Sequence, residues 1–144
     1  MSMTFPAAHP DAGKPTFFME KIKSGTKIHT IRPNYELWAK RVENVNAGTH
    51  YLSVRQWLGR AYNSKQLEHF QFEKLGIQKL TFKDGNYFHR YIDGIKCNSV
   101  TRKLLALNDG LDLLHFFHWF APMDLSQDFA IIHFTEFRYL KEHL

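Results

Sequence analysis

The sequence predicts an α+β fold in which short helices flank a curved sheet or small barrel. Two observations favour this class: the expected strands outnumber the expected helices, and they do not alternate regularly with them, as a parallel doubly wound sheet requires. The third observation is size, because 144 residues, 44% hydrophobic and 15% aromatic, can bury one core of ordinary dimensions. We therefore expect a single domain over residues 16–144, preceded by a flexible lead-in over residues 1–15.

The lead-in is rich in Pro, Gly and Ala, and it lacks the basic start and apolar stretch of a signal peptide. Residues 16–25 then place Phe18 and Ile22 one helical turn apart and end at Gly25, which predicts a short helix. A second helix is expected over residues 33–48, with a cap, three apolar side chains on one face and a stop: Asn34, Trp38, Val42, Val45 and Gly48.

The middle of the chain is typical of strands. Residues 49–57 alternate in the period-two pattern of a half-buried strand, and the Gly, Asn and Ser of residues 59–66 mark a loop. Residues 70–82 and 86–94 are rich in aromatic and β-branched side chains, which predicts further strands joined by an Asp-Gly turn.

The C-terminal third predicts two more helices and a closing strand. Residues 98–110 offer Asn98 or Ser99 as a cap, apolar side chains on one face and an Asp-Gly stop. A last helix is expected over residues 111–120, before a proline. Residues 128–140 then read as a strongly apolar strand.

The charge of the chain favours anionic partners. Nineteen Lys plus Arg against fourteen Asp plus Glu give a formal charge of +5, which suits nucleic acid or nucleotides. The single Cys97 excludes an intramolecular disulfide and a multi-cysteine zinc site, so a cytoplasmic protein is expected. The longest apolar runs are too short to span a bilayer, and no membrane role, metal or cofactor is expected.

The stretch SGTKIHTIRPN is the first candidate site. On a regular strand Lys27 and Thr30 point to opposite faces, so they converge only if the chain bends between them. Gly25 permits close backbone approach upstream, and Pro33 ends regular pairing downstream, so a bent or bulged segment is possible. The alternative is an edge strand whose Lys27 and Arg32 are merely solvated.

The stretch FFMEKIKSGTKIHTIR resembles the start of an ASCH domain, a PUA-like β-barrel family that opens with a short helix and a Gly-x-Lys-x-x-Thr-Ile-Arg motif. The matching positions are Gly25, Lys27, Thr30, Ile31 and Arg32. The closing FAIIHFTEF is similar to the last barrel strand of the family, and the Ala-Gly pair before THYLSV occupies the place of its glycine turn. The resemblance implies a PUA-like small mixed β-barrel with flanking short helices.

The resemblance also implies two kinds of function. Some ASCH proteins are amidohydrolases that deacylate acetylcytidine, and others are linked to RNA binding. Carried over to this chain, the proposed catalytic lysine and threonine are Lys27 and Thr30, and the acidic residue ahead of the last helix is Asp109. A threonine hydroxyl needs an adjacent base, and a desolvated lysine can supply it, while Arg32 can lower the lysine's pKa or hold an anionic group. The chain departs from the family pattern at Ile28, His29 and Pro33.

A second candidate site interleaves cations with rings over eleven residues: Arg55, Trp57, Arg60, Tyr62 and Lys65. Cations can contact phosphates while rings stack on bases, which is the combination that single-stranded RNA or a nucleotide requires. The alternative is a core Trp57 beside a solvated basic loop.

Histidines and the cysteine give weaker signals. His115 and His118 lie three apart on the expected last helix, within reach of one metal, and Asp112 is a conceivable third ligand. No known zinc motif is completed, so amphipathic helix histidines are the favoured interpretation. His133, inside an apolar strand, is expected to be a core histidine with a hydrogen bond, and Cys97 has no motif partner.

The sequence thus predicts an ASCH-like domain that binds RNA, a nucleoside or a nucleotide through a basic pocket around Lys27, Thr30 and Arg32. The alternative function is an amidohydrolase that deacylates an acetylcytidine-like nucleoside. An enzyme requires a closed pocket sized for a base, whereas a binding module requires an open basic groove from Arg32 to Arg55 and Lys65.

Overall fold

The computed structural model describes residues 1–60 and 62–144, and it has the expected mixed α+β class. The described residues form four α-helices, seven strands and two short 3-10 turns, at Lys83–Gly85 and Lys141–His143. In chain order, the helices and strands are α1 (Phe18–Lys23), β1 (His29–Pro33), α2 (Tyr35–Asn46), β2 (Leu52–Trp57), β3 (Gln66–Phe72), β4 (Gly76–Phe82), β5 (Arg90–Ile92), β6 (Ile95–Lys96), α3 (Ser99–Asn108), α4 (Leu113–Phe120) and β7 (Phe129–His133).

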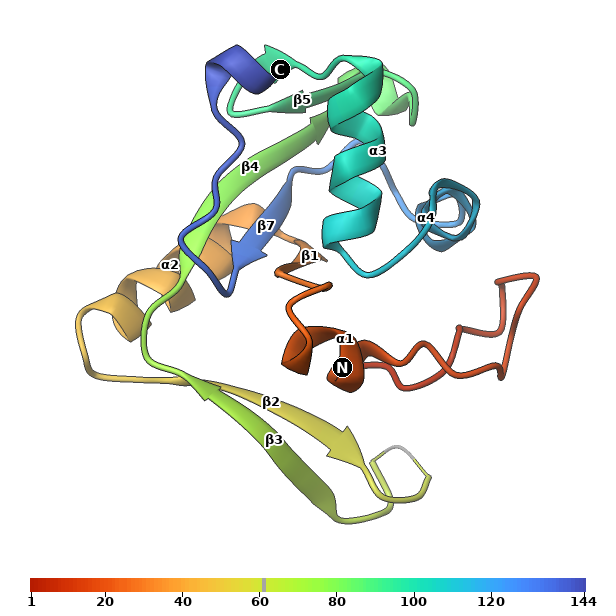
Figure 1. The fold of residues 1–144 in the computed structure, drawn as a ribbon, viewed down its shortest axis with the longest axis vertical. Coiled ribbons are helices and arrows are strands. Elements are labelled where there is room, and N and C mark those ends of the chain that lie inside the picture. Colours follow the sequence, from red (N-terminus) through yellow and green to blue (C-terminus); the bar gives the residue numbers. More distant parts are fainter. Residues whose placement is uncertain (61) are drawn as a thin grey trace.

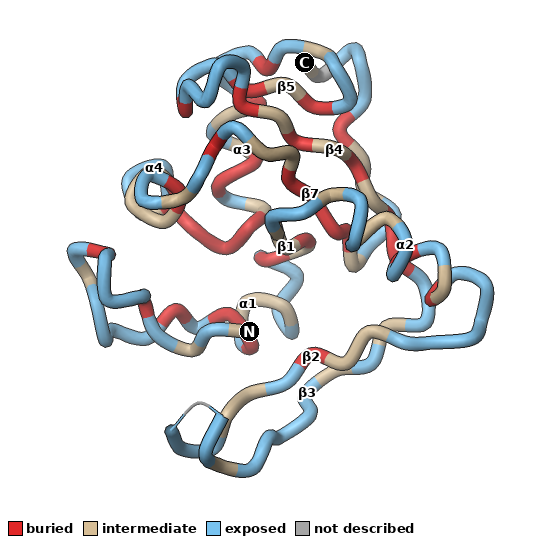
Figure 2. The backbone as a smooth tube through the Cα atoms, turned by 180° about the vertical axis from the view of Figure 1, so that it is seen from behind, coloured by how far each residue is buried: buried red, intermediate tan, exposed pale blue. Residues whose placement is uncertain are grey.

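Five strands form one antiparallel sheet in the order β1-β7-β4-β5-β6, and β2 pairs with β3 in a separate ribbon. Strand β7 lies between β1 and β4, and all five of its residues are buried (Figure 2). His133 pairs with His29 of β1 on one side and with Gly76 of β4 on the other. The β2–β3 ribbon extends away from the sheet; most residues of β3 are exposed, whereas most residues of β2 are half-buried (Figures 1 and 2).

The sheet is covered on both faces. Helix α2 packs on one face, where Val42 and Val45 meet Ala130 and Ile132 of β7. Helices α3 and α4 cover the other face, where the larger cluster gathers apolar side chains from the sheet and both helices: Leu80, Phe82, Leu105, Phe116, Phe120, Phe129 and Ile131. Because successive strand residues face opposite sides, β7 serves both clusters.

Strand β1 follows the same alternation, and this positions the candidate site. His29 and Ile31 are buried, and Ile31 belongs to the cluster under α3 and α4. Thr30 and Arg32 are half-buried and lie on the α2 face. Ile31 therefore faces helices α3 and α4, whereas Thr30 and Arg32 face helix α2.

The small barrel that the sequence predicted is not present as a closed structure. Strand β1 pairs only with β7, and the two-residue β6 pairs only with β5, so these are the open edges of the described sheet. The ribbon makes a second sheet instead of closing the first one.

Side-chain caps mark where two of the helices begin. The side chain of Asn34 accepts a hydrogen bond from the Leu37 N–H and caps α2, while Asn98 accepts one from Thr101 and caps α3. The expected turn at Asp84 and Gly85 is confirmed, with positive φ at both residues.

Two segments are arranged differently from the sequence expectation. The closing strand ends at His133, where the chain bends, and farther on the Tyr139 N–H donates to Gln78 on β4. The N-terminal segment, expected as a loose lead-in, pairs Thr4 with Pro15 and places Phe5 in the main core.

Within the part of the chain that is described, the longest helix has 12 residues, and none is long and apolar enough to cross a membrane.

Candidate functional site

A small hollow lies between β1, α2 and the base of the β2–β3 ribbon. Thr30 and Arg32 line it from β1, Arg55 lines it from β2 and Trp38 lines it from α2. Its volume is about 110 Å³. The other lining residues are Met1, Leu52, Ser53, Val54, Ile132 and Phe134. We call this site the Arg32 hollow.

Arg32 places an unpaired charge in this hollow. Its guanidinium makes no hydrogen bond or ion pair with any described residue, although it is half-buried. Burial lowers the pKa of Arg32 from its ordinary value, and the negative charge of Asp109 opposes this shift. Arginine nevertheless stays protonated, so a half-buried cation is left available for an anionic group.

Arg55 is oriented at the rim of the hollow by a short polar chain. Its Nε donates to Ser53 Oγ at 2.7 Å, and Ser53 Oγ donates to Glu68 Oε1 at 2.6 Å. A register shift between Val54 and Arg55 marks a bulge in the ribbon at this point. Bulges re-aim side chains, which is consistent with the turn of Arg55 toward the hollow.

The rest of the expected aromatic and basic set lies at the far end of the ribbon. Trp57 is half-buried, and its ring centroid is 5.3 Å from that of Tyr62. Tyr62 is 87% exposed, and Arg60 and Lys65 are exposed as well. Ala61, within the expected loop, lies outside the described residues. Trp57 therefore lies outside both apolar clusters, so the alternative of a core Trp57 does not hold.

Lys27 and Asp109 form a buried ion pair on the opposite side of the sheet. Lys27 Nζ is 2.7 Å from Asp109 Oδ1 and also donates to the Asp109 carbonyl oxygen at 2.6 Å. Only 1% and 7% of the two side chains are exposed. The Lys27 ammonium also lies 4.4 Å from the centre of the Phe18 ring, in a cation–π contact.

The charges of this pair depend on each other. Burial lowers the pKa of Lys27 from its ordinary value, and Asp109 opposes that shift. Burial acts to raise the pKa of Asp109, but Lys27 and His29 outweigh it and hold that pKa below its ordinary value. Each charge of the pair therefore favours the charged form of the other.

His29 joins this buried cluster, and sequence reasoning did not select it. Its Nδ1 lies 3.6 Å from Asp109 Oδ1, and its Nε2 is 2.8 Å from the Tyr139 hydroxyl. Asn108 Nδ2 donates to the same hydroxyl at 3.0 Å. Burial lowers the pKa of His29 and raises that of Tyr139, so both groups are neutral at pH 7. The only sequence signal was the departure of His29 from the family pattern.

His133 is a core histidine, as expected. Its Nε2 lies 3.1 Å from Gln78 Oε1, and its ring is fully buried. Burial lowers the pKa of His133 to about 3. Gln78 also bonds the backbone of Tyr139, so the two polar groups tie β7, β4 and the C-terminal segment together.

The structure brings Lys27 to Asp109, but it brings Thr30 to Arg32. Among the described residues no hydrogen bond joins Lys27 to Thr30. Lys27 contacts α1 and the end of α3, whereas Thr30 lines the hollow on the α2 face. The pairing of a lysine base with a threonine nucleophile stays a prediction.

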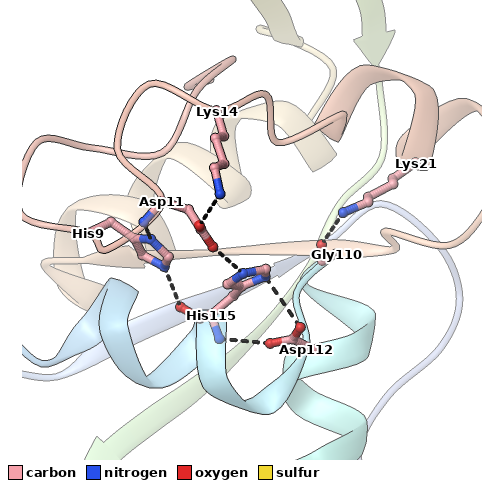
Figure 3. A network of polar contacts seen from close by, with 7 residues as sticks. All are labelled: His9, Asp11, Lys14, Lys21, Gly110, Asp112 and His115. Atoms are coloured by element: carbon pink, nitrogen blue, oxygen red, sulfur yellow. Dashed lines mark hydrogen bonds and ion pairs between the residues drawn. The ribbon is translucent and has the colours of Figure 1, made fainter.

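Both histidines of α4 contact the N-terminal segment, and Figure 3 shows the contacts of His115. His115 Nε2 lies 2.7 Å from Asp11 Oδ2, and its Nδ1 lies 3.3 Å from Asp112 Oδ2. His9 Nε2 is 3.3 Å from the His115 carbonyl oxygen, and its ring packs against that of His118. Within residues 1–60 and 62–144, no three His, Cys, Asp or Glu side chains are grouped to hold a metal. These contacts fasten the N-terminal segment to α4.

Comparisons with family models, with curated proteins and with solved structures give no match to this chain.

Proposed function

We propose that this chain is an ASCH-like, PUA-type domain that binds single-stranded RNA, or a nucleotide, through the Arg32 hollow and the β2–β3 ribbon. The observation that carries the proposal is the half-buried guanidinium of Arg32, which forms no hydrogen bond or ion pair with any described residue. An unpaired cation in a partly desolvated site is costly unless an anion occupies it. A phosphate group meets this requirement and can bond the guanidinium with two parallel hydrogen bonds.

Rings accompany the cations, which favours a nucleic acid over other anions. Trp38 lines the hollow beside Arg32, and the Trp57–Tyr62 pair lies at the far end of the ribbon. Tyr62 has a φ of 65°, a conformation that costs energy for a bulky residue, and its ring is held in solvent. Exposed rings with neighbouring cations supply the stacking and phosphate contacts of single-stranded binding.

The dimensions of the site favour an extended strand. The hollow measures about 110 Å³, below the roughly 300 Å³ at which pockets begin to enclose a small ligand. A phosphate or one edge of a base fits there, while the remaining nucleotides lie along the ribbon toward Lys65. The small, open Arg32 hollow therefore supports a binding module better than an enzyme, which requires a closed pocket sized for a base.

The direct test is fluorescence anisotropy with a labelled single-stranded RNA of about 12 nucleotides, the length that one compact domain covers. We expect binding that weakens by at least about tenfold between 50 and 200 mM salt, because phosphate contacts release counterions. A duplex of the same sequence should bind more weakly, since its bases cannot stack on Trp57 and Tyr62. Equal affinity for single strand and duplex, or an affinity that does not change with salt, would contradict the proposal.

Amide hydrolysis of an acylated cytidine is the second candidate. The specific observation in its favour is the contact of Lys27 with Asp109, because both were selected as members of one catalytic set. In such a reaction the Thr30 hydroxyl adds to the amide carbonyl while a neutral Lys27 takes its proton, and Lys27 then gives that proton to the nucleobase amine as the amine leaves. The acyl group passes from threonine to water in a second step. The separation of Lys27 from Thr30 places this candidate after RNA binding.

A further inference from the structure

A second site lies far from the Arg32 hollow, in an open groove between α3, α4 and the β4–β5 connection. The groove has a volume of about 540 Å³, and it shares no lining residue with the hollow. Its surface is mainly apolar, and large side chains are exposed there: Phe88 is 60% exposed, Leu113 45% and Leu114 63%. We call it the α3–α4 groove. Helices α3 and α4 lie on the opposite side of the domain from the ribbon (Figure 1).

Arg90 lines this groove and is an unneutralised buried cation. Only 3% of the residue is exposed, and its Nη1 is buried without a hydrogen-bond partner in the described structure. Its Nε donates to the Tyr87 carbonyl oxygen at 3.1 Å, and the guanidinium lies 4.3 Å from the centre of the Tyr87 ring. These contacts orient the side chain but supply no negative charge.

Arg102 adds a second cation to the same groove. Its Nη1 donates to the Phe88 carbonyl oxygen at 3.0 Å, and its charge acts on Arg90 in the direction of repulsion. No lining residue of the groove is acidic, and no described carboxylate forms an ion pair with either arginine. The charge of Arg102 therefore makes the buried charge of Arg90 less favourable until an anion joins them.

We propose that the α3–α4 groove docks a peptide segment of a partner protein, in which a carboxylate lies next to large apolar side chains. The carboxylate binds Arg90 and Arg102, and the apolar side chains cover Phe88, Leu113 and Leu114. The two arginines favour a ligand with a negative charge. The exposed apolar side chains favour a ligand with large apolar groups, so one ligand that carries both fits the groove best.

Other anionic ligands fit the groove less well. Phe88 offers an exposed ring, but an RNA strand also needs cations for successive phosphates, and Arg90 and Arg102 are the two cations among the lining residues of the groove. A lipid acyl chain needs an enclosed apolar channel, whereas these side chains lie open at the surface. A peptide presents separate apolar side chains and an acid at spacings that an open groove can accept.

The experiment is a selection of displayed random peptides of about 12 residues, long enough to cover one groove, on the wild-type protein. Binders are counter-selected on Arg102→Glu, and the enriched sequences are synthesised and titrated. We expect them to share an acid beside large apolar residues. Arg102→Glu and Leu114→Glu should each weaken binding by about tenfold or more. Leu37→Glu, a matched change at an exposed leucine of α2, should leave binding unchanged.

A charge reversal makes the test specific to the proposed contact. Replacement of the peptide acid by lysine should abolish binding to the wild type and restore part of it to Arg102→Glu. The proposal is overturned if no peptide is enriched over the counter-selection, if the enriched peptides lack an acid, or if the lysine peptide gains nothing on Arg102→Glu. It is also overturned if Arg102→Glu and Leu114→Glu weaken binding to single-stranded RNA or to phosphatidylserine vesicles but do not weaken binding to the peptides. Thermal unfolding of each variant checks that its fold is intact.

Discussion

Lys27 Nζ lies 2.7 Å from Asp109 Oδ1, although 82 positions separate the two residues in the sequence. Asp109 is the C-cap of α3, so Lys27 contacts a carboxylate and also a helix end that carries partial negative charge. The contact joins the segment before β1 to the helix that covers the sheet. It thereby links the motif of the candidate site to the main core.

Removal of one charge from this pair should destabilise the fold strongly. Lys27→Met leaves the Asp109 carboxylate buried without its ammonium partner, and Asp109→Leu leaves the Lys27 ammonium buried without a carboxylate. We expect each change to lower the free energy of unfolding by about 3–5 kcal/mol, and the double variant to lose less than the sum. Urea unfolding followed by tryptophan fluorescence measures these values.

The exposed pair of Lys40 and Glu43 is the matched control. It spans 3.2 Å, and both side chains are 69% exposed. Lys40→Met should therefore cost less than about 1 kcal/mol. A loss for Lys27→Met no larger than this would show that the buried pair is not a structural element.

Gly110 should not tolerate a side chain, because its φ is +82° and an added Cβ would lie 3.2 Å from Lys27 Cδ. Gly94 has the same φ of +82°, but a Cβ there would meet nothing within 4 Å. We expect Gly94→Ala to cost about 1–2 kcal/mol from backbone strain alone. Gly110→Ala should cost more, and this excess in urea unfolding isolates the contact with Lys27. Equal losses would show that Lys27 moves aside freely.

The stability of the protein should fall in acid because of His133. Burial lowers the pKa of this histidine to about 3, so the native state resists a proton that the unfolded chain accepts near pH 6.5. The free energy of unfolding is then unaffected above pH 6.5 and falls between about pH 6.5 and 3, by about 5 kcal/mol from this group. Urea unfolding at intervals of pH measures the slope.

His29 should add to the same slope, because burial lowers its pKa as well. A protein whose free energy of unfolding stays constant from pH 7 to about 4 would show that these histidines are protonated in the folded state.

Arg32→Gln should weaken RNA binding and reduce its dependence on salt. Loss of one phosphate contact lowers the slope of log K against log salt by about 0.7 for a single strand. Lys103→Gln removes the same charge from the exposed face of α3 and should have little effect on either quantity. The two variants are compared by fluorescence anisotropy at four salt concentrations. Identical slopes for both variants would place the RNA away from the Arg32 hollow.

Hydrolysis of acetylcytidine is tested with purified protein and detection of the released cytidine. If Lys27 and Thr30 act as base and nucleophile, Lys27→Arg and Thr30→Val should each reduce the rate by several orders of magnitude. Thr30→Ser should keep part of the activity, because it keeps the hydroxyl. Asp109→Asn tests the carboxylate, with its folding checked by circular dichroism. Absence of turnover above buffer in folded wild-type protein would leave RNA binding as the sole candidate.

The sequence by itself determined most of the local structure. Periodicity and caps placed the helices, since Asn34 and Asn98 use contacts within a few residues of themselves. The alternation of residues 49–57 likewise placed strand β2. The closing strand was predicted too long, because the chain bends after His133 and Tyr139 then bonds to Gln78 on another strand. Local pattern contains no information about that partner.

Tertiary structure alone decided which candidate residues meet. The motif suggested that Lys27 and Thr30 share a site, but layers on both faces of the sheet separate them: Thr30 lies with Arg32 and Arg55, and Lys27 lies with Asp109. Because β1 is an open edge, the hollow beside it borders the ribbon. In a closed barrel this edge would be paired with another strand. The sequence specifies alternation along a strand, whereas the partner on each face depends on packing between distant segments.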